Sequence, residues 1–166
     1  MPARALLALI LALLLASAAT ASAPAPPRKG VVLEGRTFGG LPLGLTQAQV
    51  RARWGGRFGV CDNCLAPTWY YTFRAYQGQG IGIQFRRGRS VAYFTLGAPH
   101  WRTGKGLAVG DPLASIQKAY GSIPTINCTG YSVEQAVFRG KLLIVYLNAG
   151  QVYGLGLSES DVDPCR

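Results

Sequence analysis

The sequence contains nearly the same pattern twice. The segment from Leu41 to Gly55 returns as the segment from Leu107 to Gly121, and one constant spacing relates the two. The paired positions agree in size or polarity: Leu41/Leu107, Leu43/Val109, Gly44/Gly110, Ala48/Ala114, Val50/Ile116, Trp54/Tyr120 and Gly55/Gly121. Extended self-similarity at a single spacing is typical of an internal repeat. The pattern therefore predicts a tandem duplication, with repeat 1 over residues 41–106 and repeat 2 over residues 107–166.

Each repeat begins with helix signals and continues with strand signals. Thr46 and Gln49 match a capping box ahead of Gly55. In the second copy Asp111 is the predicted capping acceptor, and Pro112 after it favours a helix start ahead of Gly121. β-branched and aromatic runs bounded by glycine follow at residues 68–74, 81–86, 91–96, 131–139, 142–147 and 151–157, and residues 31–38 could add a strand. We therefore expect an α+β fold in which two helix-plus-antiparallel-meander repeats share a sheet, with the helices on one face.

The N-terminal region has the pattern of an export signal. Arg4 precedes an uncharged apolar run from Leu6 to Leu15, and small residues continue to Ala23. This pattern is typical of a signal peptide, and we place its cleavage after Ala21, so that residues 1–21 are removed. The apolar run is shorter than the ~20 residues that a membrane-spanning helix needs. We expect residues 22–40 to form a Pro-rich linker and a possible first strand of a secreted chain, extracellular or in the cell envelope, without a transmembrane span.

Four cysteines follow the predicted signal: Cys61, Cys64, Cys128 and Cys165. An even number of cysteines in an exported chain favours disulfides, with three possible pairings. We favour Cys61–Cys64 and Cys128–Cys165, one bond in each repeat. A thioredoxin-like redox pair is disfavoured because that motif opens a helix after a strand, whereas Cys61 follows a predicted helix. A zinc site is disfavoured because the second pair lacks the close spacing of structural zinc ligands.

The chain is strongly basic. It holds 17 Lys and Arg against 7 Asp and Glu, a formal net charge of +10. Such a charge favours acidic partners, namely a polyanionic glycan, nucleic acid, an anionic membrane surface or an acidic protein. A genome rich in G and C would also enrich arginine, and the abundance of alanine and glycine fits that origin. The charge by itself leaves the class of partner open.

Nothing in the sequence favours catalysis. His100 is the only histidine, and it lies in residues 97–106, which we expect to link the two repeats. A serine or cysteine nucleophile that relied on it would also need an orienting acid. The carboxylates are scattered, and no phosphate-binding glycine loop is present. We therefore expect a protein that is not an enzyme, with no cofactor and no metal site.

One face of the predicted sheet combines aromatic and polar residues. If Trp69 and Tyr71 face the helix, strand alternation sends a different set to the opposite face. The set predicted to bind a partner is Tyr70, Thr72, Arg74, Gln84, Arg86 and Tyr93. Tyrosine and arginine suit interfaces because they combine contact area with polar groups. We expect this face to bind an acidic or mixed protein surface, although a register shift of one residue would exchange the two faces.

In repeat 2 the equivalent face would be apolar. It would show Leu143, Val145 and Leu147 beside the small Gly154 and Gly156. A patch of this kind is too apolar to remain in water. We expect it to be buried against the other repeat or to belong to a binding surface.

The helix motif resembles that of a known family. It comprises a glycine, a cap shortly afterwards, an aliphatic residue in mid-helix and an aromatic–glycine end, seen as Gly44-Leu-Thr46…Val50…Trp54-Gly55 and Gly110-Asp111…Ile116…Tyr120-Gly121. This arrangement resembles the tandem-repeat β-lactamase inhibitor proteins secreted by soil actinobacteria, and it is similar to the small lipoproteins of the outer-membrane assembly machine. In the inhibitor family two copies, each with a disulfide, join their sheets into a concave surface that grips a protein.

The resemblance implies a secreted, disulfide-stapled, non-enzymatic binding module that grips a protein partner with its sheet face, as an inhibitor does. The strong positive charge departs from the family pattern, and no residue identifies a β-lactamase as the target. The alternative is a basic binder of cell-wall glycan or another polyanion.

Overall fold

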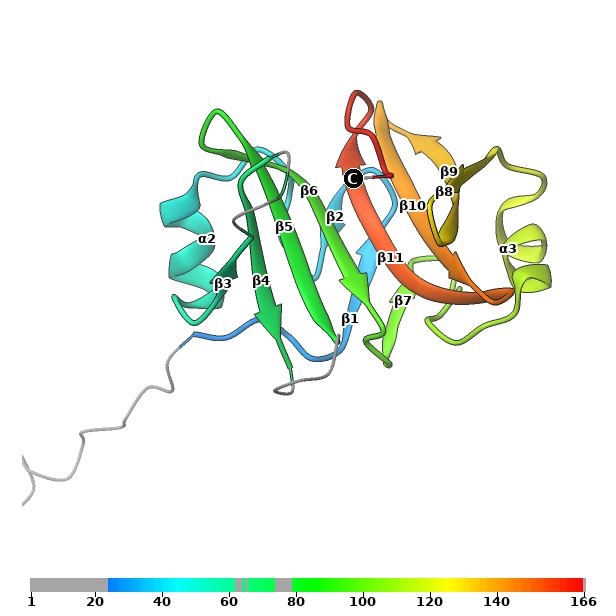
Figure 1. The fold of residues 1–166 in the computed structure, drawn as a ribbon, viewed down its shortest axis with the longest axis horizontal. Helices are drawn as coiled ribbons and strands as arrows, with labels where there is room; N and C mark the ends of the chain where they lie inside the picture. Colours follow the sequence, from blue (N-terminus) through cyan, green and yellow to red (C-terminus); the bar gives the residue numbers. More distant parts are fainter. Residues whose placement is uncertain (1–23, 62–63, 65, 74–78, 166) are drawn as a thin grey trace, which may run out of the picture.

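The computed structural model describes residues 24–61, 64, 66–73 and 79–165. An eight-stranded antiparallel sheet dominates this part of the chain (Figure 1). Its strands, in spatial order, are β3 (Gly59–Val60), β4 (Thr68–Thr72), β5 (Gly80–Arg86), β6 (Arg89–Leu96), β11 (Gln151–Glu159), β10 (Lys141–Asn148), β9 (Tyr131–Phe138) and β8 (Thr125–Cys128). The central β6–β11 pair joins strands that are far apart in sequence.

A second sheet of three strands packs against the first. It has the order β2 (Thr37–Phe38), β1 (Gly30–Leu33) and β7 (Trp101–Thr103), and β1 pairs with β2 antiparallel but with β7 parallel. Helices α2 (Gln47–Trp54) and α3 (Leu113–Tyr120) lie at opposite ends of the molecule, with the small sheet between them (Figure 1). The core therefore forms between two sheets.

The predicted α+β fold of two helix-plus-meander repeats is wrong. The described residues are mostly strand, with two helices of eight residues each. The expected linker over residues 97–106 contains β7, and residues 31–38, expected as a possible strand, contribute β1 and β2, so these segments build a second sheet. Their large apolar residues drive this outcome, because Val32, Phe38 and Trp101 are completely buried.

The two helices begin differently. Helix α2 has the predicted capping box, in which the Gln49 backbone N–H donates to Thr46 Oγ1 and the Thr46 N–H donates to Gln49 Oε1. Helix α3 begins at the N-cap Pro112 without a side-chain cap. The prediction that Asp111 caps α3 is therefore wrong, because its carboxylate accepts the backbone N–H of Ala108 instead.

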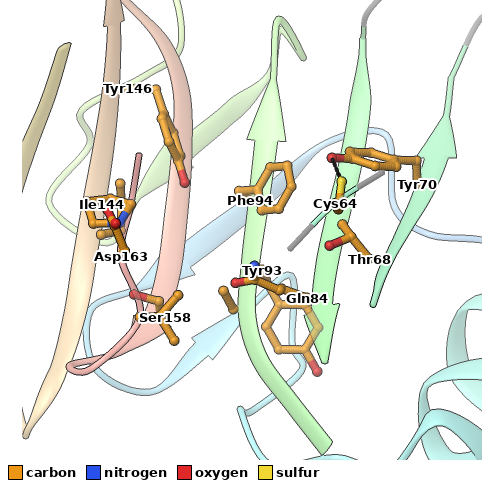
Figure 2. A pocket seen from close by; sticks show the side chains of 13 residues that line it. Cys64, Thr68, Tyr70, Gln84, Tyr93, Phe94, Ile144, Tyr146, Ser158 and Asp163 are labelled. Atoms are coloured by element: carbon orange, nitrogen blue, oxygen red, sulfur yellow. Dashed lines mark hydrogen bonds between the residues drawn. The ribbon is translucent and has the colours of Figure 1, made fainter. Parts of the chain in front are cut away.

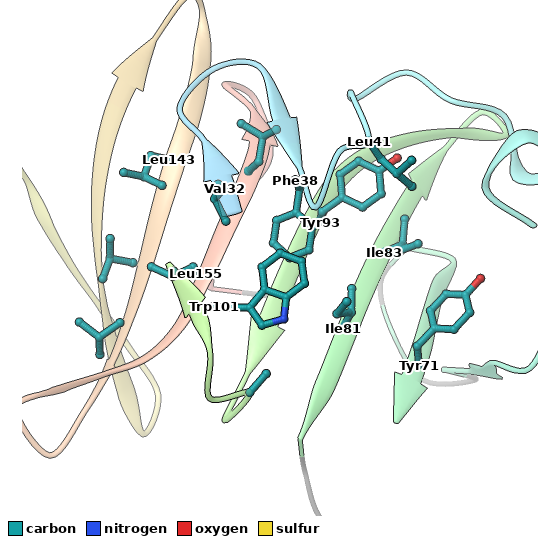
Figure 3. Close-up of a cluster of buried hydrophobic side chains, with 14 of the residues drawn as sticks. Val32, Phe38, Leu41, Tyr71, Ile81, Ile83, Tyr93, Trp101, Leu143 and Leu155 are labelled. Carbon is teal, nitrogen blue, oxygen red and sulfur yellow. The ribbon is translucent and has the colours of Figure 1, made fainter. Parts of the chain in front are cut away.

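The core is rich in aromatic rings. Phe38 stacks on Trp101 with ring centroids 4.5 Å apart and on Tyr93 at 5.7 Å (Figure 3). Trp54 of α2 packs its ring against Tyr93 at 5.8 Å, which attaches the helix to the large sheet. The other half of that sheet contributes an apolar row to the core: Leu143, Val145 and Leu147. Of the two alternatives expected from the sequence, burial or a place in a binding surface, the structure shows burial.

The β5–β6 hairpin contains a β-bulge that controls which face its residues occupy. Next to the turn, Phe85 pairs with Ser90. The following pair is Gln84 with Ala92, so Val91 is the extra residue. One inserted residue reverses the face of every side chain beyond it.

The β10–β11 hairpin also contains a β-bulge. Leu147 pairs with Val152. The next pair is Tyr146 with Gly154, so Tyr153 is the extra residue. Gly154 consequently shares the face of Tyr146, opposite to the apolar row in the core.

In the described part of the chain, no helix has both the length and the apolar character needed to cross a membrane.

Candidate binding groove on the open face of the large sheet

The face of the large sheet that points away from the small sheet carries two adjacent rows of side chains. One row crosses the strands at five aligned positions: Tyr70, Gly82, Phe94, Gly156 and Ile144. The other row crosses the same strands one pleat away: Thr68, Gln84, Ala92, Ser158 and Leu142. Small residues alternate with large ones in the first row, and Ala92 and Ser158 are adjacent in the second, which leaves hollows between the large side chains.

A strip of aromatic rings follows the first row. Tyr70 contacts Phe94 with ring centroids 6.0 Å apart, Phe94 contacts Tyr146 at 6.3 Å, and Tyr146 contacts Tyr131 at 6.1 Å. Gly82 makes room for the central ring, because a Cβ atom at that position would lie 2.0 Å from the Phe94 ring. The strip therefore crosses the sheet from β4 to β9, and Figure 2 shows Phe94 between Tyr70 and Tyr146.

The strip divides a groove into two hollows that share Tyr70, Phe94 and Tyr146. The first has a volume of about 210 Å³ and lies over the row that includes Gln84 and Ser158 (Figure 2). The second has a volume of about 470 Å³, and its lining also includes Leu96, Tyr131 and Tyr153. We call these the Ala92 hollow and the Tyr153 hollow.

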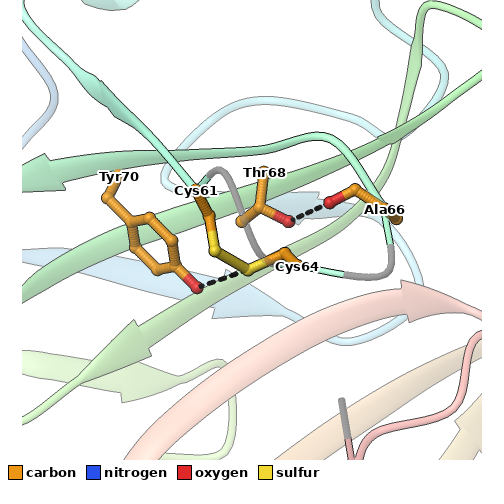
Figure 4. Close-up of a disulfide and its surroundings, with 5 residues drawn as sticks. All are labelled: Cys61, Cys64, Ala66, Thr68 and Tyr70. Carbon is orange, nitrogen blue, oxygen red and sulfur yellow. Dashed lines mark hydrogen bonds between the residues drawn. A yellow bond between two sulfur atoms is a disulfide. The ribbon is translucent and has the colours of Figure 1, made fainter.

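A disulfide stands at each end of the groove. The structure joins Cys61 to Cys64, which is the pairing expected from the sequence, and the Cys64 Sγ lies 3.9 Å from the Tyr70 hydroxyl (Figure 4). At the other end, the second expected bond, Cys128–Cys165, holds the C-terminal tail beside the open face. There the Tyr131 hydroxyl donates to the Pro164 carbonyl oxygen at 3.3 Å.

A small apolar cluster supports this second end. Val133, Leu142 and Ile144 are buried on the open face, with Tyr131 and Tyr146 packed against them. Burial raises the pKa of the Tyr146 hydroxyl well above its usual value, and the neighbouring Tyr131 and Tyr70 add to that effect. The Tyr131 pKa is also raised, first by burial and then by the Asp163 carboxylate. These rings therefore stay neutral at physiological pH.

The electrostatic character of the groove contrasts with that of the whole chain. Among the described residues that line the two hollows there is no lysine, arginine or histidine, although the chain has 17 Lys and Arg. Asp163 supplies a carboxylate at the Ala92 hollow. The described lining of the groove therefore lacks the cationic groups with which a basic protein would hold an anion.

The predicted partner-binding residues do not all meet in the groove. Tyr70, Thr72 and Gln84 lie on the open face. Tyr70 and Gln84 line the Ala92 hollow, whereas Thr72 lines a separate pocket of about 180 Å³ beside Gly82. Arg86 lies at the margin, exposed and paired with Asp161 at 2.9 Å. That contact raises the pKa of Arg86 and lowers the pKa of Asp161. Arg74 lies outside the described residues.

The prediction for Tyr93 is wrong. Its ring is completely buried on the core side, and its hydroxyl donates to the Pro42 carbonyl oxygen at 3.1 Å. The bulge at Val91 is the physical reason, because an unbroken ladder from the turn would have aligned Tyr93 with Gly82 instead of Ile83. For the same reason Phe94 was not predicted as a groove residue. It occupies the position opposite Gly82 on the open face that Tyr93 was expected to take.

Other groove residues were missed for want of a local signal. Tyr131 and Tyr146 belong to the second half of the chain, where the sequence pattern singles out the aliphatic residues Leu143, Val145 and Leu147. Ser158 was missed as well, yet it is 3% exposed and lines the Ala92 hollow. In the part of the chain that the structure describes, no three His, Cys, Asp or Glu side chains gather as a metal-binding cluster.

Comparison with known proteins places the fold but not a family. The chain matches no protein-family model and no curated protein. Its fold is similar to that of an extracellular protein containing an SCP domain from Bacillus anthracis str. Ames, with a TM-score of 0.53 and 10% identity. The similarity covers 71% of this chain and 44% of that one, so the chain spans less than half the length of that protein. At this identity the likeness concerns the fold alone.

Two further solved structures are more distantly similar. A cysteine-rich secretory protein from Staphylococcus aureus subsp. aureus Mu50 gives a TM-score of 0.46 and 13% identity, over 79% of this chain and 51% of that one. A DUF4309-family protein from Bacillus subtilis subsp. subtilis str. 168 gives a TM-score of 0.44 and 12% identity, over 69% of this chain and 78% of that one.

Proposed function

We propose that this protein is an exported binding module that grips a protein partner in the groove on its open sheet face, and that it binds without catalysing a reaction. The observation that carries the proposal is the strip of four contacting rings, Tyr70, Phe94, Tyr146 and Tyr131, on a sheet face that no other sheet or helix of the described residues covers. Aromatic residues are enriched at the centres of protein interfaces, where they supply most of the binding energy.

The surroundings of the groove support this use. A disulfide at each end limits local motion, so less conformational entropy is lost when a partner binds. Disulfides also fit the oxidising compartments that an exported chain reaches.

The absence of catalysis is part of the proposal. His100 does not line either hollow; it is exposed at the turn before β7, with a φ of 72°. A nucleophile in the groove would therefore lack histidine as its base. A partner-dependent hydrolytic activity that His100→Ala abolished would contradict this part of the proposal.

Site-directed cross-linking tests the binding face. A photo-activated amino acid placed at position 70 should cross-link a partner from culture supernatant or envelope fractions. The same group at position 113, where Leu113 is exposed on α3, should not. Identical products from both positions, or none from position 70, would move the site away from this face.

Titration then measures the affinity of groove variants for the partner that the cross-link identifies. Anchors at an interface centre commonly contribute about 2 kcal/mol or more each, so a Tyr70→Ala, Phe94→Ala double variant should weaken binding by about a thousandfold. The matched control is Leu113→Ala, which should change the affinity by less than about threefold. Unchanged affinity in a folded double variant would contradict the proposal.

A second candidate function rests on the distribution of charge. Between Gly35 and Gly110 the only carboxylate in the sequence is Asp62. In the same stretch Arg51 and Arg53 are exposed on α2, and the Arg89 guanidinium donates to the Gly44 carbonyl oxygen beside the start of that helix. This basic end of the molecule suits a polyanion such as a cell-wall glycan polymer.

A further inference from the structure

The Ala92 hollow has the dimensions of a receptor for one side chain. Ala92 stands between Gln84 and Ser158 in its cross-strand row, and its single methyl group leaves space between these two polar residues. The hollow has a volume of about 210 Å³. This volume is below the roughly 300–1,000 Å³ of pockets that hold whole small molecules. A single inserted side chain is the occupant that suits its size.

A buried hydroxyl in the hollow lacks a hydrogen-bond partner. Ser158 is 3% exposed, and among the described residues no group bonds its Oγ atom. A buried polar group left unpaired costs about 1–3 kcal/mol, so native structures pair nearly all of them. Ser158 lines the hollow together with Gln84 (Figure 2). Because Ser158 lines the hollow, a polar group bound there would lie beside this unpaired hydroxyl.

The walls of the hollow favour a cationic group over an anionic one. Phe94, Tyr70 and Tyr146 contribute aromatic rings, and Asp163 contributes a carboxylate. Ring faces attract cations within about 6 Å of their centroids. No lysine, arginine or histidine occurs among the described lining residues, so an anion would meet no opposite charge.

We infer that the Ala92 hollow receives the guanidinium group of an arginine side chain from the partner. This inference rests on the proposed function and names the anchor that the groove recognises. A guanidinium is planar and stacks on rings, and its several N–H groups can donate together to Ser158 Oγ, the Gln84 side-chain oxygen and the Asp163 carboxylate. A lysine ammonium is a compact point charge that stacks less well. The groove thus selects a basic segment, whereas the sequence alone suggested an acidic or mixed surface.

Two small probes of matched shape test the charge requirement. N-acetyl-L-argininamide and N-acetyl-L-citrullinamide differ in that citrulline replaces the guanidinium with a neutral urea. Titration of the isotope-labelled mature chain, followed by NMR, should show argininamide binding with a Kd on the order of millimolar. The largest shifts should fall on the amides of Phe94 and Ser158. Citrullinamide should bind at least tenfold more weakly, and N-acetyl-L-lysinamide at least threefold more weakly.

Variants locate the binding within the hollow. Ala92→Val fills the space and should abolish argininamide binding, and Ser158→Ala should weaken it by about fivefold or more. Asp163→Asn should weaken it similarly while keeping the oxygen that accepts the Cys165 N–H. The matched control Asp161→Asn changes the carboxylate that pairs with Arg86 at the margin and should leave probe binding unchanged. Phe94→Leu preserves the bulk of that side chain without its ring and provides a second test if Ala92→Val does not fold.

The outcomes separate this inference from the proposed function. Equal binding of argininamide and citrullinamide, or shifts centred outside the hollow, would overturn the guanidinium assignment. So would a partner that still cross-links at position 70 and binds Ala92→Val with full affinity, and in that case the groove would remain the partner's site. Loss of the position-70 cross-link while argininamide still binds would overturn the proposed function and leave the guanidinium site standing.

Discussion

Trp101 and Phe38 connect the two sheets at the level of single residues. Their stacked rings are both completely buried, and Phe38 also contacts Tyr93 and Trp54 on the large-sheet side. The small sheet has three short strands and could not persist without a partner surface. These two rings are therefore the main apolar attachment of β1, β2 and β7 to the rest of the molecule.

Replacing Trp101 with alanine should destabilise the protein by about 3–5 kcal/mol, the usual cost of truncating a fully buried tryptophan. Urea unfolding at neutral pH measures this change. Leu33→Ala serves as the control, because Leu33 is 42% exposed in the same sheet and should cost less than about 1 kcal/mol. Similar losses for the two variants would contradict the position of Trp101 in the core.

Tyr93 should make the protein sensitive to alkaline pH. Burial raises the pKa of Tyr93 to about 12, partly offset by the Ser90 hydroxyl and by Arg53. The folded state therefore holds this proton more tightly than the unfolded state, whose tyrosine pKa is about 10. The resulting stability is fully present below pH 10 and is lost as pH rises from 10 to 12, by about 1.4 kcal/mol for each pH unit.

Urea midpoints measured between pH 8 and pH 12 check the Tyr93 prediction. Tyr93→Phe should unfold more easily at pH 8, because it loses the bonds to Pro42 and Ser90, but its stability should fall less steeply above pH 10. The exposed Tyr153 supplies the control, and Tyr153→Phe should keep the steep decline. An unchanged slope in Tyr93→Phe would show that this hydroxyl does not couple folding to pH.

At the scale of elements, the two β-bulges determine which residues face the groove. Each lies close to a hairpin turn and inserts one residue into the second strand, Val91 in β6 and Tyr153 in β11. Beyond Val91, Phe94 points to the open face and Tyr93 to the core. The position of each bulge therefore determines which residues line the groove.

The disulfide that closes the longer loop should stabilise the fold more. In the chain-entropy model, a bond across a sequence separation of 37 contributes roughly 4 kcal/mol and one across 3 contributes roughly 2 kcal/mol. The Cys128→Ala, Cys165→Ala double variant should therefore lose more stability than the Cys61→Ala, Cys64→Ala double variant. Urea unfolding of both, after peptide mapping of the native pairing, gives the comparison. The reverse order would contradict the prediction.

Local features of the sequence predicted individual elements well. The capping box at Thr46 and Gln49 placed α2, and glycine-bounded aromatic and β-branched runs identified six strands of the large sheet. The preferred disulfide pairing agrees with the structure. These features depend on neighbours in sequence, so a single chain is enough to recognise them.

Features that depend on distant partners were not predictable in the same way. Trp101 lies in a short segment that becomes a strand only because β1 pairs beside it. The bulge at Val91 determines which side chains of β6 point to the core and which to the open face. Valine is common in regular strands, so the residue type gives no sign of the bulge. For the same reason the groove was only half predicted: Tyr70 and Gln84 were placed correctly, whereas Phe94 and Ser158 were not.

At the scale of the whole molecule, the positive charge and the aromatic groove occupy different places. Exposed arginines lie on α2 and in the β5–β6 turn, including Arg51, Arg53 and Arg87. The described lining of the groove holds no base. Two ligands of opposite charge could therefore bind the same molecule at separate sites.

Salt should distinguish the two sites. Binding of a polyanion such as heparin to the basic end should weaken steeply between 50 and 500 mM NaCl, because exposed charges are screened within about 10 Å at 0.1 M salt. An Arg51→Ala, Arg53→Ala variant should reduce that binding further and leave the groove partner unaffected. Binding of the groove partner should change by less than about fivefold over the same range. Equally steep dependence for both ligands would indicate a single electrostatic site.

The parallel pairing of β1 with β7 has a consequence for the order in which the chain becomes structured. Gly30 aligns with Trp101 and Val32 with Thr103, so the first strand meets this partner only after most of the large sheet's first half has been synthesised. Until residue 103 emerges, Val32 and Phe38 have no Trp101 to cover them. During synthesis from the N-terminus, the core between the two sheets would therefore close only after β7 has emerged, later than the hairpins of the first half of the large sheet.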